Sequence, residues 1–320
     1  MRRVLVAVLL GVLVYGVFVL YAGLSEIRSS LQRFHFSALF IALALATTNY
    51  GFRFVKWQYY LARLDVRGVG VLDSFLVFLS GFVLTVTPGK VGEVFKSAVL
   101  AKTHGVPAER TAPIVVAERL TDAIGVIALI VLGSTAFAGG LGWAIAGILA
   151  VSVGIALIVW ELPMQMVLRW IEPRPGFLGR VAPKLRVAFG SLRVVAGPAA
   201  LIYPTLLSIL AWGCEGIALY VLLRGFEAQV GLGSAIFFYS TATLAGALIP
   251  VPGGLGVAEA MIQEQLVHLG QVPKPDATAA MILIRFATLW WAVLVGFAAL
   301  GILRLRFPDK LGSAELAEGS

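Results

Sequence analysis

Apolar residues run along this chain in long blocks separated by short polar clusters. A helix that crosses a bilayer needs roughly 20 mainly apolar residues. Six blocks reach that length: residues 4–24, 36–62, 112–135, 141–160, 199–224 and 278–303. The pattern predicts an all-α, polytopic membrane protein with six spanning helices.

Two further apolar blocks are interrupted by proline and glycine. Residues 71–101 break at Pro88-Gly89, and residues 232–269 break between Pro250 and Gly254. The part after each break is shorter than the roughly 20 residues that a span needs. Non-helical backbone at membrane depth survives only where it is buried in protein or faces water. We therefore predict two re-entrant helical hairpins, each returning to the side from which it entered.

Basic residues indicate the orientation, because Lys and Arg concentrate in cytoplasmic loops. The first apolar block is longer than a signal-peptide core, so we predict a retained span with a cytoplasmic N-terminus. Both termini then lie inside, and the predicted outer side holds only a few basic residues. The predicted inner positions are Arg2, Arg3, Arg63, Arg67, Lys102, Arg110, Arg169, Arg174, Arg180, Lys184, Arg186, Arg193, Arg304, Arg306 and Lys310. The predicted outer positions are Arg28, Arg33, Arg224 and Lys274.

The chain is predicted to form one transmembrane domain, residues 1–307, followed by a polar tail, residues 308–320, with no appended soluble domain. Residues 161–198 form a basic, proline-rich cytoplasmic loop. We expect an amphipathic segment there that lies on anionic lipids of the inner leaflet. A regulatory or partner-docking loop is the alternative.

The two hairpin regions share a charge pattern. Arg119 follows Glu93 by 26 residues, and Arg285 follows Glu259 by 26 residues, so one offset of 166 residues relates both pairs. By the predicted topology the two hairpins enter from opposite sides. Repeat 1 (about 71–135) and repeat 2 (about 232–303) are therefore predicted to be inverted copies. Such repeats with Gly/Pro-broken segments indicate a transport site near the midplane.

Composition agrees with a membrane protein: 59% of residues are hydrophobic and 13% are charged, against about 25% charged in soluble domains. We attribute the net charge of +8 to cytoplasmic Lys and Arg, not to nucleic-acid binding. A single cysteine, Cys214, leaves no disulfide framework. No P-loop, serine elbow, zinc-protease motif or metal cluster is present, so we predict no cofactor, no metal and no enzyme activity.

The broken helices suggest an anion site. The helix after each break begins deep in the membrane, and its first backbone N–H groups lack intrahelical partners. The helix dipole adds positive partial charge there. Gly253 and Gly254 allow backbone to approach a ligand, and Lys90, Arg119 and Arg285 add full charges nearby. Phosphate or carboxylate is the predicted ligand.

Ionisable residues within the membrane are functional hypotheses by default. Two interpretations of Glu93 and Glu259 remain open. They either neutralise Arg119 and Arg285 and pin the hairpins, or exchange those partners for a proton or substrate during turnover. Asp122 lies one helical turn from Arg119, and Glu118 also lies near the predicted core.

The second span carries a polar stripe. Arg53 is predicted to line the path, Lys56 is predicted to snorkel to the inner end, and Glu215 on the fifth span has no obvious partner. The predicted substrate-binding set is Lys90, Glu93, Arg119, Asp122, Gly253, Gly254, Glu259, Arg285 and Arg53.

Three motifs carry a resemblance: Pro88-Gly89-Lys90-Val91-Gly92-Glu93, Glu118-Arg119-Leu120-Thr121-Asp122, and the stretch from Pro250 to Glu259. With them the chain resembles the lysylphosphatidylglycerol synthase transmembrane (flippase-like) family, which includes the membrane half of multiple-peptide-resistance-factor proteins. The resemblance covers roughly residues 5–305. It implies lipid translocation or binding at the inner membrane, with Glu93, Arg119, Asp122, Glu259 and Arg285 in the central cavity.

Two departures limit what the resemblance implies. No C-terminal aminoacyl-transferase domain is recognisable, so synthesis of lysyl-phosphatidylglycerol is not expected. Lys90 and Lys96 stand where arginines are expected, which alters the expected head-group preference.

We therefore expect an ATP-independent, flippase-like translocase of a prokaryotic cytoplasmic membrane that moves an anionic or zwitterionic lipid. Its phosphate is expected between the two half-helix N-termini at the midplane. The alternatives are a secondary transporter of a small anionic solute and a non-catalytic partner subunit of a lipid-linked sugar pathway. Two protein partners are considered: a second copy of the chain and an enzyme of a lipid pathway.

Overall fold

The computed structural model of the chain describes residues 23–86, 93–134, 177–249 and 251–311, with isolated positions elsewhere. Within these ranges the chain forms helices and short connections and no strand, so the all-α prediction is confirmed there. The predicted spans 4–24 and 141–160 lie outside the described ranges, apart from single positions.

The helices follow the apolar blocks closely. The main ones, in chain order, are α2 (Leu24–Arg33), α3 (Ser37–Arg63), α4 (Val71–Ser80), α5 (Phe95–His104), α6 (Ala108–Thr111), α7 (Pro113–Ser134), α10 (Phe177–Ala196), α11 (Pro198–Gly225), α12 (Leu232–Leu248), α13 (Val257–His268), α14 (Lys274–Arg285), α15 (Trp291–Arg306) and α16 (Pro308–Leu311). A 3-10 helix, η1 (Gly81–Leu84), continues α4, and a π-helical turn (Phe286–Trp290) joins α14 to α15.

Within the described ranges, three helical segments are long and apolar enough to cross a membrane: 37–63, 199–225 and 274–306. Helix α7 has 22 residues, and its first half contains Glu118, Arg119 and Asp122. A multi-pass arrangement is thus supported, whereas the predicted number of six spans is not confirmed.

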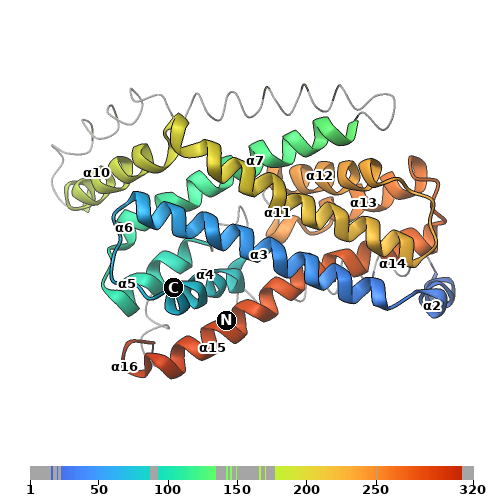
Figure 1. The fold of residues 1–320 in the computed structure, drawn as a ribbon, viewed down its shortest axis with the longest axis horizontal. Helices are drawn as coiled ribbons and strands as arrows, with labels where there is room; N and C mark the ends of the chain where they lie inside the picture. Colours follow the sequence, from blue (N-terminus) through green and yellow to red (C-terminus); the bar gives the residue numbers. More distant parts are fainter. Residues whose placement is uncertain are drawn as a thin grey trace.

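Each interrupted block forms two helical segments that pack against each other; we call each such pair a hairpin, and its re-entry into the membrane stays a prediction. The first consists of α4 with η1 and then α5, and the second consists of α12 and then α13. At 1.5 Å per residue, the 10 residues of α5 and the 12 residues of α13 are each too short for a hydrocarbon core of about 30 Å. Figure 1 shows the first hairpin toward one end of the long axis and the second toward the other.

The two hairpins meet in the middle of the molecule. A Cβ atom added to Gly253, at the tip of the second hairpin, would lie 3.5 Å from the Cα atom of Val86 in the first. Val86 also belongs to a buried apolar cluster with Leu255, Leu289 and Val293. Gly253 has φ 61°, a left-handed conformation that favours glycine. The described end of the first hairpin and the tip of the second therefore lie against each other.

Each repeat also packs its last helix against the hairpin of the other repeat. A Cβ at Gly133 of α7 would lie 2.7 Å from the carbonyl oxygen of Gly233, at the start of α12. A Cβ at Gly296 of α15 would lie 2.7 Å from the backbone nitrogen of Val83 in η1. Small residues allow such close approach of membrane helices. The two segments predicted to be repeats thus approach each other closely at both positions.

Segments that the predicted topology places on the same side of the membrane contact each other in the structure. At one end, Arg306 pairs with Asp73 at 2.9 Å, and Lys310 donates to the carbonyl of Thr103 at 2.6 Å. At the other end, α2 packs against α14. This grouping agrees with the predicted topology, and which end is cytoplasmic stays a prediction.

Candidate functional site

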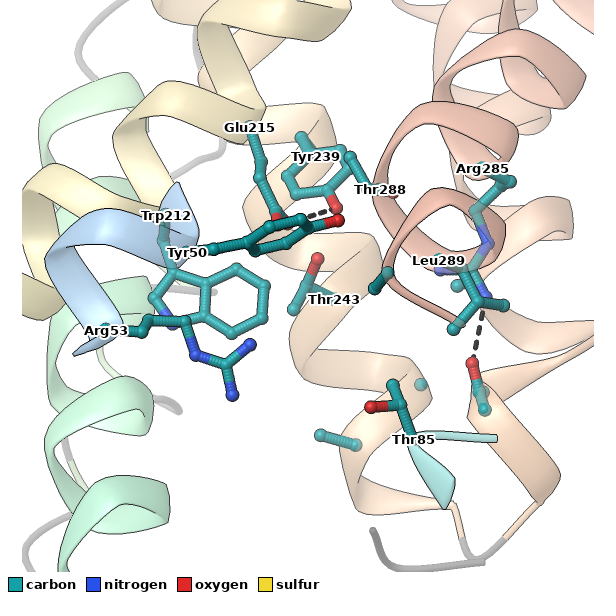
Figure 2. A pocket seen from close by; sticks show the side chains of 16 residues that line it. Tyr50, Arg53, Thr85, Trp212, Glu215, Tyr239, Thr243, Arg285, Thr288 and Leu289 are labelled. Atoms are coloured by element: carbon teal, nitrogen blue, oxygen red, sulfur yellow. Dashed lines mark hydrogen bonds between the residues drawn. The ribbon is translucent and has the colours of Figure 1, made fainter. Parts of the chain in front are cut away.

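A cavity of about 70 Å³ lies where the two hairpin tips, α3, α11 and the π-helical turn converge (Figure 2). A cavity needs about 10–15 Å³ to hold one water molecule, so this one has room for several waters or a small polar group. Its polar side chains are Tyr50, Arg53, Thr85, Trp212, Glu215, Tyr239, Thr243, Arg285 and Thr288.

Arg285 reaches the cavity from the end of α14 and is held by the second hairpin. Its Nε donates to Oε1 of Glu259 at 2.6 Å, and one Nη donates to the carbonyl of Gly253 at 2.8 Å. The other carboxylate oxygen of Glu259 accepts a 2.7 Å bond from the backbone nitrogen of Gly256, which precedes α13. The Glu259 carboxylate therefore caps α13, and Arg285 fastens the hairpin tip to the following span.

Arg53 reaches the cavity from α3. Its guanidinium lies 3.5 Å from Oε1 of Glu93 and 5.2 Å from the ring centre of Phe82. Both contacts are with residues of the first hairpin. Arg53 from α3 and Arg285 from α14 thus bring two positive charges to the cavity, and Figure 2 shows them on opposite flanks.

An ion-pair network extends from Arg53 into the first repeat. Arg119 lies 2.9 Å from Oε2 of Glu93 and 3.0 Å from Oδ2 of Asp122. The other oxygen of Asp122 accepts from Lys56 at 2.5 Å and from Ser208 of α11 at 2.9 Å. The network joins α3, the first hairpin, α7 and α11.

Lys56 corrects the sequence prediction. It was expected to snorkel to the inner end, but it is only 1% exposed and bonds to Asp122. Proximity of a residue to a helix end does not indicate which neighbour its side chain meets. Lys96, which was not predicted as a site residue, forms a similar buried pair with Glu118 at 2.5 Å.

Glu215 also has a partner that the sequence did not indicate. The hydroxyl of Tyr239 on α12 donates to Glu215 Oε2 at 2.5 Å. Tyr50 and Trp212 line the same side of the cavity. This cluster adds a carboxylate to the cavity, at the top of the view in Figure 2.

The structure divides the predicted set in three. Arg53, Gly253, Gly254 and Arg285 line the cavity. The predicted residues that form ion pairs outside its lining are Glu93, Arg119, Asp122 and Glu259. Lys90 lies outside the described residues. Whether any of them binds substrate stays a prediction.

Sequence reasoning missed the aromatic and hydroxyl part of the lining. Thr288 and Leu289 line the cavity from the π-helical turn, and such turns are frequent at functional sites. Nothing in the apolar pattern of residues 286–290 distinguishes a π turn from ordinary helix. The position of Glu215 within an apolar span was the usable signal for the acidic end.

Comparison with known proteins agrees with the fold. A curated protein of Methanothermobacter thermautotrophicus, described as a UPF0104 membrane protein, is 23% identical over 331 residues, which cover 96% of this chain and 97% of the relative. The family model "Lysylphosphatidylglycerol synthase TM region" matches residues 6–296. The resemblance seen in the motifs is thereby confirmed over nearly the whole chain. The chain is a membrane protein that belongs to the lysylphosphatidylglycerol synthase TM region family.

Proposed function

We propose that this protein is an ATP-independent translocase for a phosphate-bearing anionic or zwitterionic lipid in a prokaryotic cytoplasmic membrane. The observation that carries the proposal is the cavity at the meeting point of two oppositely directed hairpins, with Arg53 on one flank and Arg285 on the other. Inverted repeats with broken helices place substrate at such a junction in many transporters.

The two arginines suit a lipid phosphate. A guanidinium presents donors in a planar fork that matches phosphate oxygens. Thr85 adds a hydroxyl to the cavity wall, and its oxygen is buried without a hydrogen-bond partner in the described part of the chain. A buried hydroxyl that lacks a partner costs free energy, so a ligand that bonds to it is favoured. The head group would occupy the cavity while the acyl chains stay in the bilayer.

The arrangement changes one detail of the expected site. The phosphate was expected between two half-helix N-termini, but Glu259 already supplies a carboxylate to the backbone at the start of α13. The corresponding turn of the first hairpin, residues 87–92, lies outside the described residues. We therefore assign the phosphate to Arg53, Arg285 and Thr85.

Transport requires the cavity to open to each side in turn. We assign the closure of one route to the buried pairs around Glu93 and Asp122, and the closure of the other to the Glu259–Arg285 pair. Rocking of one repeat against the other around the fixed site is the expected motion.

The test is lipid translocation in proteoliposomes without ATP, measured as the fraction of a fluorescent phospholipid that becomes accessible to an external quencher. We expect wild-type protein to equilibrate the probe, and Arg53→Gln with Arg285→Gln to slow it by about tenfold or more, since each lost charge-assisted bond is worth about 1.5–3 kcal/mol. Arg306→Gln, at one end of the molecule, is the matched control and should keep the wild-type rate. Wild-type vesicles that translocate no faster than empty ones would overturn the proposal.

The cavity volume favours one second candidate, a transporter of a small anionic solute. About 70 Å³ holds a small anion without any acyl chain. The same proteoliposomes separate the two functions, because solute transport predicts inorganic phosphate efflux with no movement of the lipid probe.

A further inference from the structure

The cavity has two chemically different ends. The first end consists of Arg53, Thr85 and Arg285, which Figure 2 shows at the left, bottom and right of the cavity. Glu215 and Tyr239 lie at the top of that view, beside Tyr50. A site for phosphate alone needs only the first end. The second end places a buried carboxylate, 4% exposed, in the same small space.

The acidic end combines three acceptors for a cation. Oxygens of Glu215, Tyr50 and Thr243 face the same space in Figure 2. The Tyr239 hydroxyl donates to Glu215 and thereby orients its carboxylate. An alkylammonium group has three N–H donors, so it can bond to the carboxylate and to two of the hydroxyl oxygens. The chemistry matches a cation with several donors better than it matches a second anion.

Aromatic rings line the cavity together with this carboxylate. Tyr50, Trp212 and Tyr239 all line the cavity, from α3, α11 and α12 respectively. A cation near an aromatic face is attracted by the ring quadrupole, and aromatic cages around ammonium groups use this attraction. Rings together with a carboxylate therefore favour an organic ammonium over a small hydrated metal ion.

The Tyr50 hydroxyl gives independent support for a ligand here. Tyr50 is 3% exposed, and its hydroxyl oxygen is buried without a hydrogen-bond partner among the described residues. A buried polar atom of this kind calls for an explanation, because burial without a bond costs free energy. A ligand ammonium next to Glu215 supplies the missing bond.

We propose that the cavity recognises a zwitterionic head group, with its ammonium at Glu215, Tyr50 and Trp212 and its phosphate at Arg53, Arg285 and Thr85. This inference rests on the proposed function and narrows its substrate class to lipids that carry both groups. The shared chemistry, a phosphate joined to an ammonium, also occurs in soluble phosphoamines, so the test separates the two sources.

The test compares lipids with identical acyl chains by native mass spectrometry of detergent-purified protein. Phosphatidylethanolamine carries the ammonium, its N-acetyl derivative keeps the phosphate but loses the positive charge, and phosphatidylglycerol has a hydroxyl head. We expect wild-type protein to hold phosphatidylethanolamine about tenfold or more over the N-acetyl derivative, the size of one or two charge-assisted contacts. Equal binding of these two lipids by the wild type overturns the inference without any mutation.

The variant Glu215→Gln tests whether Glu215 causes the preference for phosphatidylethanolamine. The amide oxygen still accepts the bond from Tyr239, but the negative charge is gone. We expect the preference for phosphatidylethanolamine to fall to near one while phosphatidylglycerol binding stays unchanged. Glu264→Gln is the matched control, because that carboxylate is exposed on α13 and contacts His268, and it should keep the full preference. A Glu215→Gln protein that keeps the preference overturns the assignment to Glu215.

Two further outcomes separate the ligand sources and the two proposals. Displacement of bound phosphatidylethanolamine by millimolar phosphoethanolamine assigns the site to a soluble ligand, and retention of the lipid assigns it to the membrane. Wild-type protein that holds no phosphate-bearing lipid contradicts the proposed function itself. Protein that holds phosphate-bearing lipids without regard to the ammonium contradicts only the further inference.

Discussion

The two hairpins carry the same charge pair in different surroundings. In repeat 2, Glu259 is bonded to Arg285 and to the backbone of Gly256, and Arg285 in turn holds the carbonyl of Gly253. Every one of these contacts lies within the second hairpin and its following span. In repeat 1, Glu93 is shared between Arg119 and Arg53, which lies on α3 outside the hairpin.

The ion-pair network around repeat 1 includes more residues than the Glu259–Arg285 pair alone. Arg119 also meets Asp122, and Asp122 also meets Lys56 and Ser208 of α11. A residue with two partners of opposite charge keeps one when the other leaves. We therefore expect Glu93 to exchange between Arg119 and Arg53 during transport. This difference is not visible in the equal spacing of Glu and Arg in the sequence.

Removal of the Glu259 charge should have the largest effect. Glu259→Gln leaves the guanidinium of Arg285, with a side chain 10% exposed, without this carboxylate and weakens the cap of α13. Loss of one partner of a buried pair costs about 3–5 kcal/mol. We expect a marked fall in the thermal midpoint in detergent, measured by light scattering or fluorescence. Glu264→Gln on the exposed face of α13 is the control, and an equal fall in both variants would show that the pair does not pin the hairpin.

Substitutions at the two close contacts between the repeats, at Gly296 and at Gly133, should have the next largest effect on the free energy of unfolding. A methyl group at Gly296 would meet backbone of η1 at 2.7 Å, and one at Gly133 would meet backbone of α12 at 2.7 Å. Because backbone cannot move aside cheaply, Gly296→Ala and Gly133→Ala should each cost about 1–3 kcal/mol.

Gly301→Ala provides the control for both substitutions, since a Cβ there meets nothing within 4 Å. Similar losses at Gly133 and Gly296 indicate that the two repeats are interlocked symmetrically. If only one of the two variants loses stability, only that contact between the repeats is tightly packed.

The positions of the long helices in the described ranges followed from the sequence, because the apolar pattern measures how much chain fits in a bilayer, whereas the number of six spans is not confirmed. The predicted block 36–62 became α3, and the predicted break in the second interrupted block falls between α12 and α13. The pairing of Glu93 with Arg119 and of Glu259 with Arg285 followed from one repeated spacing. These features depend on local composition or on internal symmetry.

Contacts between distant helices did not follow. Lys56 lies 66 residues from Asp122, and Glu215 lies 24 residues from Tyr239, so no helical periodicity relates either pair. Helix rotation decides which side chains meet, and in nearly uniform apolar helices the hydropathy pattern defines rotation poorly. The acidic end of the cavity was missed for this reason.

Glu93→Gln should cost less than Glu259→Gln, although the two glutamates are equivalent in the repeat. Arg119 keeps Asp122 at 3.0 Å, and Arg53 keeps its position over the ring of Phe82. The glutamine oxygen still accepts one bond, so we expect a loss of about 1–2 kcal/mol. Thermal melts of the two variants side by side measure the difference, and equal losses would remove the distinction between a shared and a local pair.

The smallest effect is expected at the ends of the molecule, where the ion pairs are open to solvent. Arg306 pairs with Asp73 at 2.9 Å, but its side chain is 46% exposed, and Arg33 pairs with Asp276 with a side chain 75% exposed. Exposed pairs contribute about 0–1 kcal/mol and are screened by salt. Arg306→Gln and Arg33→Gln should therefore lower the thermal midpoint only slightly, and the change should vanish in high salt, whereas the loss in Glu259→Gln should persist. If salt removed all of these differences equally, the ion pairs at the centre would be solvated like those at the ends, and burial could not explain why the two repeats differ.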